Sequence, residues 1–266
     1  MSGAPAAIPR VLTIASSDSG GGAGIQADLK AFARCGAHGM SAIVALTAQN
    51  TLGVTAIEEL SPAFVRAQID AVLDDIGADA VKTGMLFSAP LIEAVADALE
   101  TRYLPLVVDP VMVASSGSRL LLPDAVGTLV ARLFPLATVV TPNLPEAQAL
   151  TQLATEDRAV LAERLAAMGA PAVLVTGGHG ADPVDHLFDG STHVAIPVAR
   201  HRIAATHGAG CTHSAALAAG LAAGLSLTEA ARLAADVAGD AVAHGLAGLG
   251  KGDGPVHALH GYTACG

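Results

Sequence analysis

Two glycines surround an alanine directly before a cysteine in the segment Gly208-Ala209-Gly210-Cys211, and a long alanine-rich stretch follows. We expect a helix whose first amides, those of Ala209, Gly210 and Cys211, converge on an oxyanion, because the first N–H groups of a helix lack intrahelical partners. The helix terminus would also lower the pKa of the Cys211 thiol, which makes Cys211 a candidate base or polarising group. The alternative is an ordinary glycine-led start of a buried helix.

Three charged residues lie where the sequence predicts the ends of strands. Asp109 closes an apolar run, and Glu146 follows Asn143-Leu-Pro at the expected start of a helix. Two carboxylates so placed could share a Mg²⁺ ion that bridges phosphates, although each alone also suits a cap or a turn. Lys82 stands among apolar neighbours at another strand end. A lysine without a partner is rarely buried, so Lys82 is a candidate site residue.

The glycine-rich segment 22–27 matches a dinucleotide-binding fingerprint only weakly. Six residues separate it from the preceding apolar run, and no acidic residue follows Asp28 at the distance expected for a ribose ligand. We therefore interpret it as a loop that leads into a helix, which presents Asp28 and Gln26 to a small ligand. The chain contains neither a P-loop nor the nucleophile elbow G-x-S-x-G.

Short apolar runs alternate with stretches of helical periodicity along the chain. The runs are 11–15, 41–46, 80–83, 106–109, 138–141 and 172–176. Apolar strands that alternate with helices predict an α/β fold in three layers, α/β/α, with a mainly parallel central sheet and helices on both faces. We expect a small edge hairpin over 184–198. Two helices should follow over 209–246, divided at Gly224 with Thr228 as the second N-cap.

Ligands of open parallel sheets bind beyond the carboxyl ends of the strands. The residues that follow the predicted strands are 16–24, 47–50, 82–85, 109–112, 141–146 and 176–179, and they are rich in Gly, Asp, Asn and Lys. A single site at this edge of the sheet is therefore expected. We find no linker and no repeat, so residues 1–266 are predicted to form one domain.

The chain has 266 residues with 14 Lys+Arg and 24 Asp+Glu, a formal net charge of −10. An acidic chain with 3% aromatic residues offers no phosphate-tracking surface and no base-stacking platform, so we expect no nucleic-acid partner. The best candidate for a membrane span, 215–225, is too short, and the first residues show no secretory signal. Unrelated spacings of Cys35, Cys211 and Cys265 predict neither disulfides nor zinc. We expect a cytoplasmic protein without membrane association, whose His257 and His260 face solvent.

Taken together, these junctions resemble the hydroxymethylpyrimidine/phosphomethylpyrimidine kinases of thiamine biosynthesis, in the ribokinase-like superfamily. The segments that carry the resemblance are GAGIQADLK (22–30), AQNT (48–51), DPVM (109–112), TPNLPEA (141–147), VTGGHG (175–180) and HGAGC (207–211). They run in order along nearly the whole chain. The resemblance implies a ribokinase-like fold. It also implies ATP- and Mg²⁺-dependent phosphorylation of 4-amino-5-hydroxymethyl-2-methylpyrimidine to its monophosphate and then to the pyrophosphate.

The resemblance also implies roles for individual residues. The pyrimidine site would comprise Gln49, Asp28, Ser16, Met85 and Val111. The site of phosphoryl transfer would comprise Gly208, Ala209, Gly210, Cys211 and Lys82. The nucleotide side would comprise Asn143, Thr176 and Gly178, with Asp109 and Glu146 at Mg²⁺. An amide such as that of Gln49 suits the donor and acceptor nitrogens of an aminopyrimidine.

Four positions depart from the pattern of the family, and one of them is Asp253, which stands near a usual His. Ser16 stands where relatives usually have Gly, and His213 replaces a usual apolar residue. Thr176 stands where many relatives have Lys, which leaves Lys82 or backbone amides to meet the ATP phosphates. A pyridoxal or pyridoxine kinase of the same fold and a catalytically silent pyrimidine-binding protein stay open as alternatives. The alanine-rich helices and the short edge hairpin are compatible with a homodimer.

Overall fold

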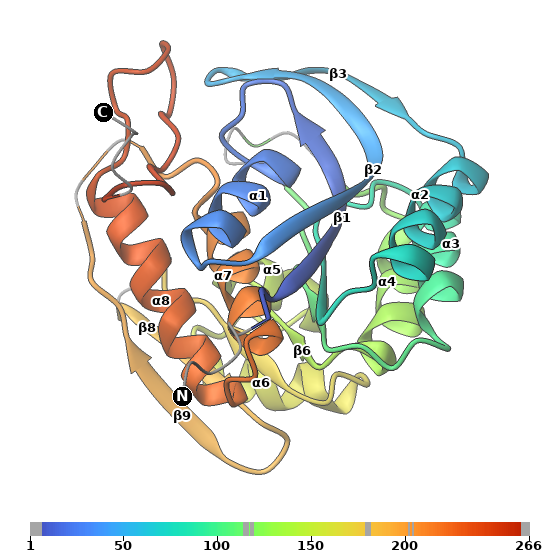
Figure 1. The fold of residues 1–266 in the computed structure, drawn as a ribbon. Coiled ribbons are helices and arrows are strands. Elements are labelled where there is room, and N and C mark those ends of the chain that lie inside the picture. Colours follow the sequence, from blue (N-terminus) through green and yellow to red (C-terminus); the bar gives the residue numbers. More distant parts are fainter. Residues whose placement is uncertain are drawn as a thin grey trace, which may run out of the picture.

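The computed structural model describes residues 7–113, 117, 120–178, 182–201, 203 and 205–261. Its centre is a nine-stranded sheet in the order β3-β2-β1-β4-β5-β6-β7-β8-β9 (Figure 1). Neighbouring strands from β2 to β7 are parallel, whereas β3 at one edge and β8 and β9 at the other pair antiparallel. The predicted mainly parallel sheet is thus confirmed. Cys265 and His179, the last residue of the predicted ligand-facing segment 176–179, lie outside the described residues.

The strands lie at or near the predicted apolar runs. They are β1 (Arg10–Asp18), β2 (His38–Asn50), β3 (Gly53–Glu59), β4 (Ala80–Thr83), β5 (Leu106–Val108), β6 (Val139–Val140), β7 (Val173–Val175), β8 (Val184–Phe188) and β9 (His193–Pro197). The β8–β9 pair is the expected edge hairpin. A second hairpin, β2–β3, is not predicted from the sequence. Strand β3 is mostly exposed and so lacks the apolar run that marks a buried strand.

Helices cover both faces of the sheet, as predicted. They are α1 (Gly24–Arg34), α2 (Pro62–Asp75), α3 (Ala89–Leu99), α4 (Ala125–Leu133), the 3₁₀ turn η1 (Phe134–Leu136), α5 (Leu144–Thr151), α6 (Arg158–Ala167), α7 (Ala209–Ala222) and α8 (Leu227–Ala243). Helices α1, α7 and α8 share one core with Val11, whereas α2 to α6 share another with Leu12 (Figure 1). Adjacent strand residues enter different cores because their side chains point to opposite faces. Among the described residues, no helix combines the length and the apolar character that crossing a membrane requires.

Local sequence signals fix where several helices begin. Ser61 accepts the amide of Phe64, and Pro62 is the first residue of α2. Ser226 and Glu229 form a reciprocal capping box at the start of α8, so Ser226 is the N-cap and the prediction of Thr228 is wrong. The S-x-x-E pair satisfies two backbone donors at once, which Thr228 does not. Gly224 has φ 83° and separates α7 from α8 as expected.

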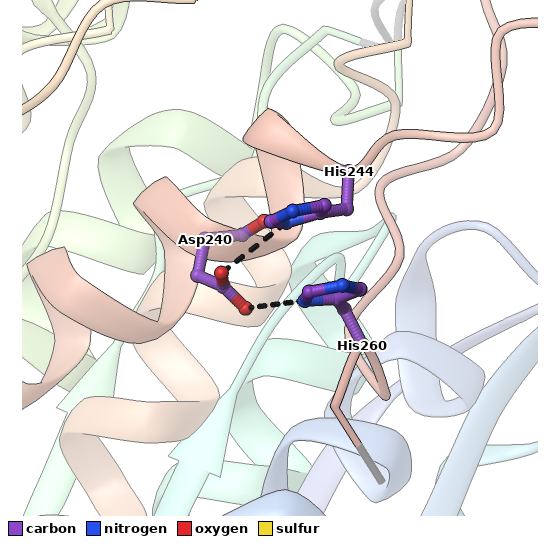
Figure 2. Close-up of side chains that lie close together, drawn as sticks. All are labelled: Asp240, His244 and His260. Atoms are coloured by element: carbon purple, nitrogen blue, oxygen red, sulfur yellow. Dashed lines mark hydrogen bonds and ion pairs between the residues drawn. The ribbon is translucent and has the colours of Figure 1, made fainter. Parts of the chain in front are cut away.

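The C-terminal segment folds back onto α8 and α1. The ring of His260 stacks on that of His244, and their Nδ1 atoms lie 3.3 and 3.2 Å from the two carboxylate oxygens of Asp240 (Figure 2). Arg34 of α1 donates to the same carboxylate at 2.7 Å. His260 is thus partly exposed, with 38% of its side-chain surface accessible, and is bound to Asp240 at the same time. The amide of Val256 donates to the carbonyl of His207, which ties this segment to the loop before α7.

Candidate active site

A cavity of about 640 Å³ opens where the parallel strands end. Its walls come from the loops after β1, β4, β5, β6 and β7 and from the first turn of α7, as expected for an open parallel sheet. The predicted site residues that line it are Ser16, Gln49, Lys82, Met85, Asp109, Val111, Asn143, Glu146, Thr176, Gly178, Gly208, Ala209, Gly210 and Cys211. Asp28 is wholly buried and does not line the cavity. Gln26, which was also expected to face the ligand, does not line it either, because its side chain bonds the amide of Asp18 and the hydroxyl of Ser17.

The first turn of α7 forms an open cradle at one end of the cavity. Gly208 has φ 83°, and a Cβ there would lie 1.8 Å from the carbonyl oxygen of Gly22, so only glycine lets the two loops touch. The amide of Ala209 donates to the carbonyl of Thr206 at 3.1 Å, which corrects the expectation of three free donors. Within the described part of the chain, the amides of Gly210 and Cys211 have no protein acceptor. The backbone amides of Gly210 and Cys211 are therefore two unpaired helix donors in the wall of the cavity.

The Cys211 thiol is neutral at physiological pH. Burial, together with the nearby charges of Asp28 and Asp109, raises the pKa of Cys211 to about 12, although the Lys82 ammonium opposes the shift. The expectation of a thiolate is therefore wrong, because loss of water around the sulfur outweighs the helix terminus. Cys211 lines the cavity and, as a thiol, offers a weak S–H donor.

A buried ammonium lies at the floor of the cavity. Lys82 Nζ lies 2.8 and 2.9 Å from the two carboxylate oxygens of Asp28 and 4.0 Å from Asp109 Oδ2. Thr13 Oγ1 donates to Asp28 Oδ2 at 2.6 Å. Burial alone would lower the pKa of Lys82, but the surrounding negative charges raise it, so the side chain stays charged. Asp28 is thus the counter-ion of Lys82, and its predicted direct contact with the substrate is corrected.

A pair of buried carboxylates lies beside the cradle. Ser214 Oγ of α7 donates to Asp109 Oδ2 at 2.8 Å. Glu146 forms a capping box with Asn143, in which each side chain accepts the other residue's amide at 2.9 Å. Burial and the charge of Asp109 raise the pKa of Glu146 to about 8. Two hard oxygen donors that repel one another in the absence of a cation fit Mg²⁺, which binds proteins through one or two carboxylates.

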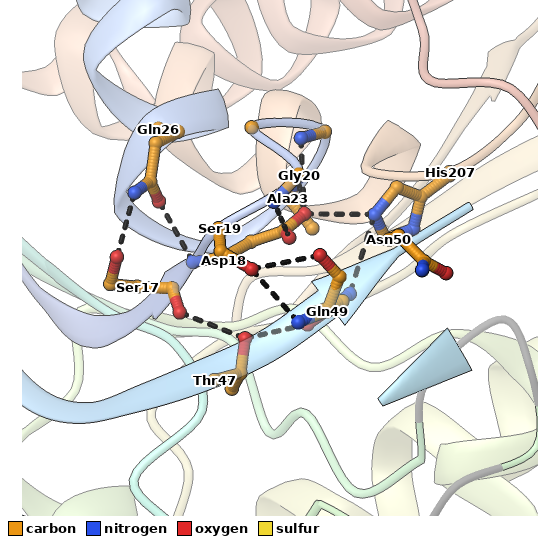
Figure 3. A network of polar contacts seen from close by, with 12 residues as sticks. Ser17, Asp18, Ser19, Gly20, Ala23, Gln26, Thr47, Gln49, Asn50 and His207 are labelled. Carbon is orange, nitrogen blue, oxygen red and sulfur yellow. Dashed lines mark hydrogen bonds and ion pairs between the residues drawn. The ribbon is translucent and has the colours of Figure 1, made fainter. Parts of the chain in front are cut away.

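A polar network joins the glycine-rich loop to the loop before α7 (Figure 3). The carboxylate of Asp18 accepts the amides of Gly20, Gly22 and Ala23 and lies 3.0 Å from His207 Nε2. Burial opposes ionisation, but the bonds from His207 and the amides outweigh it and lower the pKa of Asp18. His207 Nε2 also lies 3.4 Å from Gln49 Nε2. Ser19 Oγ donates to the backbone carbonyl of Gln49 and accepts its amide, both at 2.8 Å, which holds the predicted pyrimidine ligand Gln49 in place.

Sequence reasoning assigned no role to several residues of this site. Asp18, Thr47 and His207 line the cavity, whereas Ser214 supports Asp109 from behind. Thr47 Oγ1 lies 3.1 Å from Gln49 Oε1 and 3.0 Å from the carbonyl oxygen of Ser17. Position just after a strand was an available signal for Asp18. No spacing rule could have paired Asp18 with His207, because the two lie 189 positions apart.

One group outside the cavity also brings together three side chains that can ligate metals. Asp240, His244 and His260 place their ligand atoms within 4.8 Å of one another (Figure 2). The two imidazole planes are nearly parallel, at 7°, so the lone pairs of their Nδ1 atoms run side by side instead of converging. Arg34 already neutralises Asp240. The geometry therefore suits a clasp for the C-terminal segment better than a metal centre.

Solved structures with the same architecture are kinases of small heterocycles. The ADP complex of Bacillus subtilis pyridoxal kinase matches with a TM-score of 0.86 and 38% identity, covering 95% of this chain and 98% of that one. Phosphomethylpyrimidine kinase from Clostridium difficile matches with a TM-score of 0.76 and 41% identity, covering 86% of this chain and 96% of that one. The fold is therefore that of the ribokinase-like vitamin kinases, as predicted.

Sequence comparison narrows this class further. A sequence model described as phosphomethylpyrimidine kinase matches residues 18–257. The hydroxymethylpyrimidine/phosphomethylpyrimidine kinase of Rhizobium meliloti is 51% identical over 256 residues, which are 94% of this chain and 96% of that protein. The enzyme of the same name from Bacillus subtilis is 46% identical over 257 residues, 94% of each chain. The chain belongs to the phosphomethylpyrimidine kinase family, and the predicted resemblance is confirmed.

The raised pKa of Cys211 predicts how its reaction with iodoacetamide depends on pH. Because only the thiolate reacts, the rate should rise about tenfold per pH unit from about pH 7 to about pH 10 without a plateau. Mass spectrometry of the peptide that contains Cys211 measures the rate, and a Cys211→Ser variant confirms the assignment. A plateau between about pH 9 and 10 would show an ordinary thiol, and a plateau near pH 8 would show a thiolate; either would overturn the raised pKa of Cys211.

The pairing of Lys82 with Asp28 predicts a large loss of stability in Asp28→Asn. The variant leaves a buried ammonium without its counter-ion, so the free energy of unfolding should fall by about 3–5 kcal/mol. Urea denaturation followed by circular dichroism measures the loss. Asp79→Asn is the matched control, because it breaks the partly exposed pair with Arg10 and should cost much less. Equal losses in the two variants would contradict the assigned role.

Proposed function

We propose that this protein transfers the γ-phosphoryl group of ATP to the hydroxymethyl group of 4-amino-5-hydroxymethyl-2-methylpyrimidine. It then phosphorylates the monophosphate to the pyrophosphate, as a step of thiamine biosynthesis. The observation that carries the proposal is the pairing, in one cavity, of the open amides at Gly210 and Cys211 with the side-chain amide of Gln49. Relatives that share about half of the residues carry this activity in their names.

The pyrimidine binds against Gln49 in this proposal. Its side-chain amide offers one donor and one acceptor, which match the exocyclic amino group and a ring nitrogen. Thr47 Oγ1 lies 3.1 Å from Gln49 Oε1, and the Ser19 hydroxyl bonds both backbone groups of Gln49 at 2.8 Å, so Gln49 is positioned before the substrate arrives. Met85 and Val111 supply apolar surface for the ring. Ser16 narrows this wall without an unsatisfied hydroxyl, since Ser16 Oγ donates to the carbonyl of Met85 at 3.0 Å.

Phosphoryl transfer depends on positioning and on neutralising charge. The transition state is loose, with negative charge spread over the transferring oxygens. The amides of Gly210 and Cys211 are placed to donate to those oxygens, and the Lys82 ammonium adds positive potential from the floor of the cavity. Cys211 contributes its backbone amide and a neutral thiol. It does not remove the proton of the hydroxymethyl group, because its pKa lies far above neutrality.

The nucleotide side of the proposal comprises Asn143, Thr176 and Gly178, which line the same cavity. Asp109 and Glu146 would hold Mg²⁺, whose charge neutralises the phosphates of bound ATP. Ser214 and the amide of Asn143 orient the two carboxylates through the hydrogen bonds described above. Thr176 supplies no positive charge. In this proposal, backbone amides and the metal therefore balance more of the negative charge of the ATP phosphates near Thr176.

We further propose that residues 1–266 act as one domain, because the nine strands described form one sheet. The protein is proposed to work in the cytoplasm, where ATP is available, and to assemble as a homodimer. Leu46 and Leu52 support assembly, because they are exposed apolar side chains on the β2–β3 hairpin at the edge of the sheet.

The decisive experiment is mass analysis of the products formed from the hydroxymethylpyrimidine with ATP and Mg²⁺. We expect a species with one added phosphate first and a species with two later, and no product when EDTA removes the metal. Pyridoxal as the alternative alcohol should react more slowly at equal concentration. Binding of the pyrimidine without conversion of ATP to ADP would favour a silent binding protein, and faster reaction of pyridoxal would favour the vitamin B6 alternative.

The cradle predicts that Gly210→Asp abolishes transfer while the fold survives. A Cβ at residue 210 meets no atom within 4 Å, so the side chain fits but places a carboxylate beside the phosphoryl oxygens. Loss of one preorganised donor typically costs about 10²–10³ in turnover, and an opposing charge costs more. Gly127→Asp on α4 is the matched control, since it is equally unobstructed and lies outside the cavity. Unchanged turnover of Gly210→Asp, with the control also active, would refute the cradle.

A further inference from the structure

A buried histidine–carboxylate pair lies in the cavity wall and has no part in the mechanism above. His213 Nε2 of α7 lies 2.8 Å from Asp185 Oδ2 of β8. Both residues are almost completely buried, with 5% and 2% of their surface exposed. Burying a histidine and a carboxylate together costs desolvation that a pair of apolar residues would avoid. The pair therefore needs an explanation in terms of what it connects.

Asp185 also holds the loop that follows β7. Its Oδ1 accepts the amide of Gly177 at 2.6 Å, so its two oxygens have two different partners. Gly177 packs directly against the backbone of β8, because a Cβ at residue 177 would lie 2.5 Å from the carbonyl carbon and oxygen of Val184. The neighbours of Gly177 are Thr176 and Gly178, the residues proposed to meet ATP. Asp185 thus fixes the nucleotide loop against β8.

His213 connects the same carboxylate to the phosphoryl cradle. Helical side chains lean toward the N-terminus of their helix, so the imidazole lies over the turn that contains Ala209 and Gly210. Among the described residues, His213 Nδ1 has no hydrogen-bond partner, which leaves Nε2 and Asp185 to hold the ring. Through one carboxylate, the first turn of α7 and the loop after β7 are therefore tied to each other.

We propose that His213 and Asp185 are positioning residues that set the spacing between the two phosphate-binding walls before ATP binds. The inference rests on the proposed function, which assigns one wall to the transferred phosphoryl group and the other to the nucleotide. A polyphosphate that spans both walls binds more tightly when their spacing exists in advance, because it then pays no ordering cost. The pyrimidine subsite around Gln49 does not depend on this tie.

The test compares His213→Leu with His213→Gln. Leucine breaks the bond to Asp185, and the dissociation constant of AMP-PCP and the KM for ATP should rise about ten- to hundredfold, as expected for a lost hydrogen bond to a carboxylate. The kcat at saturating ATP and the KM for the pyrimidine should stay near the wild-type values. The amide nitrogen of glutamine lies near the position of Nε2, so His213→Gln should restore most of the affinity.

A double-variant cycle tests whether the two residues act through each other. Asp185→Asn loses one of its two acceptor roles and should weaken AMP-PCP binding as His213→Leu does. The double variant should be no weaker than either single variant, because both break the same tie. Should His213→Leu fail to fold, His213→Asn replaces it, since its shorter amide cannot reach Asp185. His193→Leu, at an exposed site of the same hairpin, is the control and should bind normally.

Calorimetric titration with AMP-PCP measures the nucleotide affinity of each variant independently of the reaction. Wild-type affinity in both His213→Leu and His213→Asn would overturn the inference, and so would fully additive losses in the cycle. Equal increases in the KM for ATP and for the pyrimidine would also overturn it, because they would indicate a general structural role. If the wild-type protein binds AMP-PCP but does not phosphorylate the pyrimidine, the proposed function fails, while these binding comparisons still decide the inference.

Discussion

The charge of one buried lysine constrains the centre of the molecule. Lys82 lies at the end of β4, where water cannot solvate its ammonium, so the surrounding chain must supply negative charge. Asp28 reaches it from α1, Asp109 approaches from the end of β5, and Thr13 of β1 supports Asp28. The requirement links one helix to three adjacent strands. The same surroundings keep the Cys211 thiol neutral, so the fold itself limits which groups can exchange protons.

The polar groups of the cavity are held in place before any ligand binds. Asp18 accepts three loop amides, Glu146 closes a capping box, and Ser214 supports Asp109. Such supporting bonds reduce the reorganisation that a reaction with developing negative charge would otherwise require. The two walls also depend on close packing of backbone, because Gly208 touches Gly22 and Gly177 touches Val184. Preorganisation here comes from many short contacts between distant segments.

Much of the architecture could be predicted because buried parallel strands appear as apolar runs. The β2–β3 hairpin was missed, since an exposed edge strand has no such run. Most of the predicted site residues line one cavity, because they lie at or just after the carboxyl ends of strands or at the start of α7. The incorrect predictions concern the surroundings of individual side chains. Burial raises the pKa of Cys211, which was expected to be lowered, and Asp28, which was expected to contact the substrate, binds Lys82 instead. Neither burial nor a partner 54 positions away can be recognised from local spacing.

The sequence alone determined three things: the order of strands and helices, the edge of the sheet that binds ligands, and the family. These depend on hydrophobic periodicity and on short motifs, which are local features of the sequence. Folding alone decided which side chains became partners. Three hydrogen-bonded pairs of the site join residues that lie 189, 105 and 28 positions apart: His207 with Asp18, Ser214 with Asp109, and His213 with Asp185. Their pairing and protonation depend on distance and on exclusion of water, and both quantities exist only once the sheet and its two helical layers have packed.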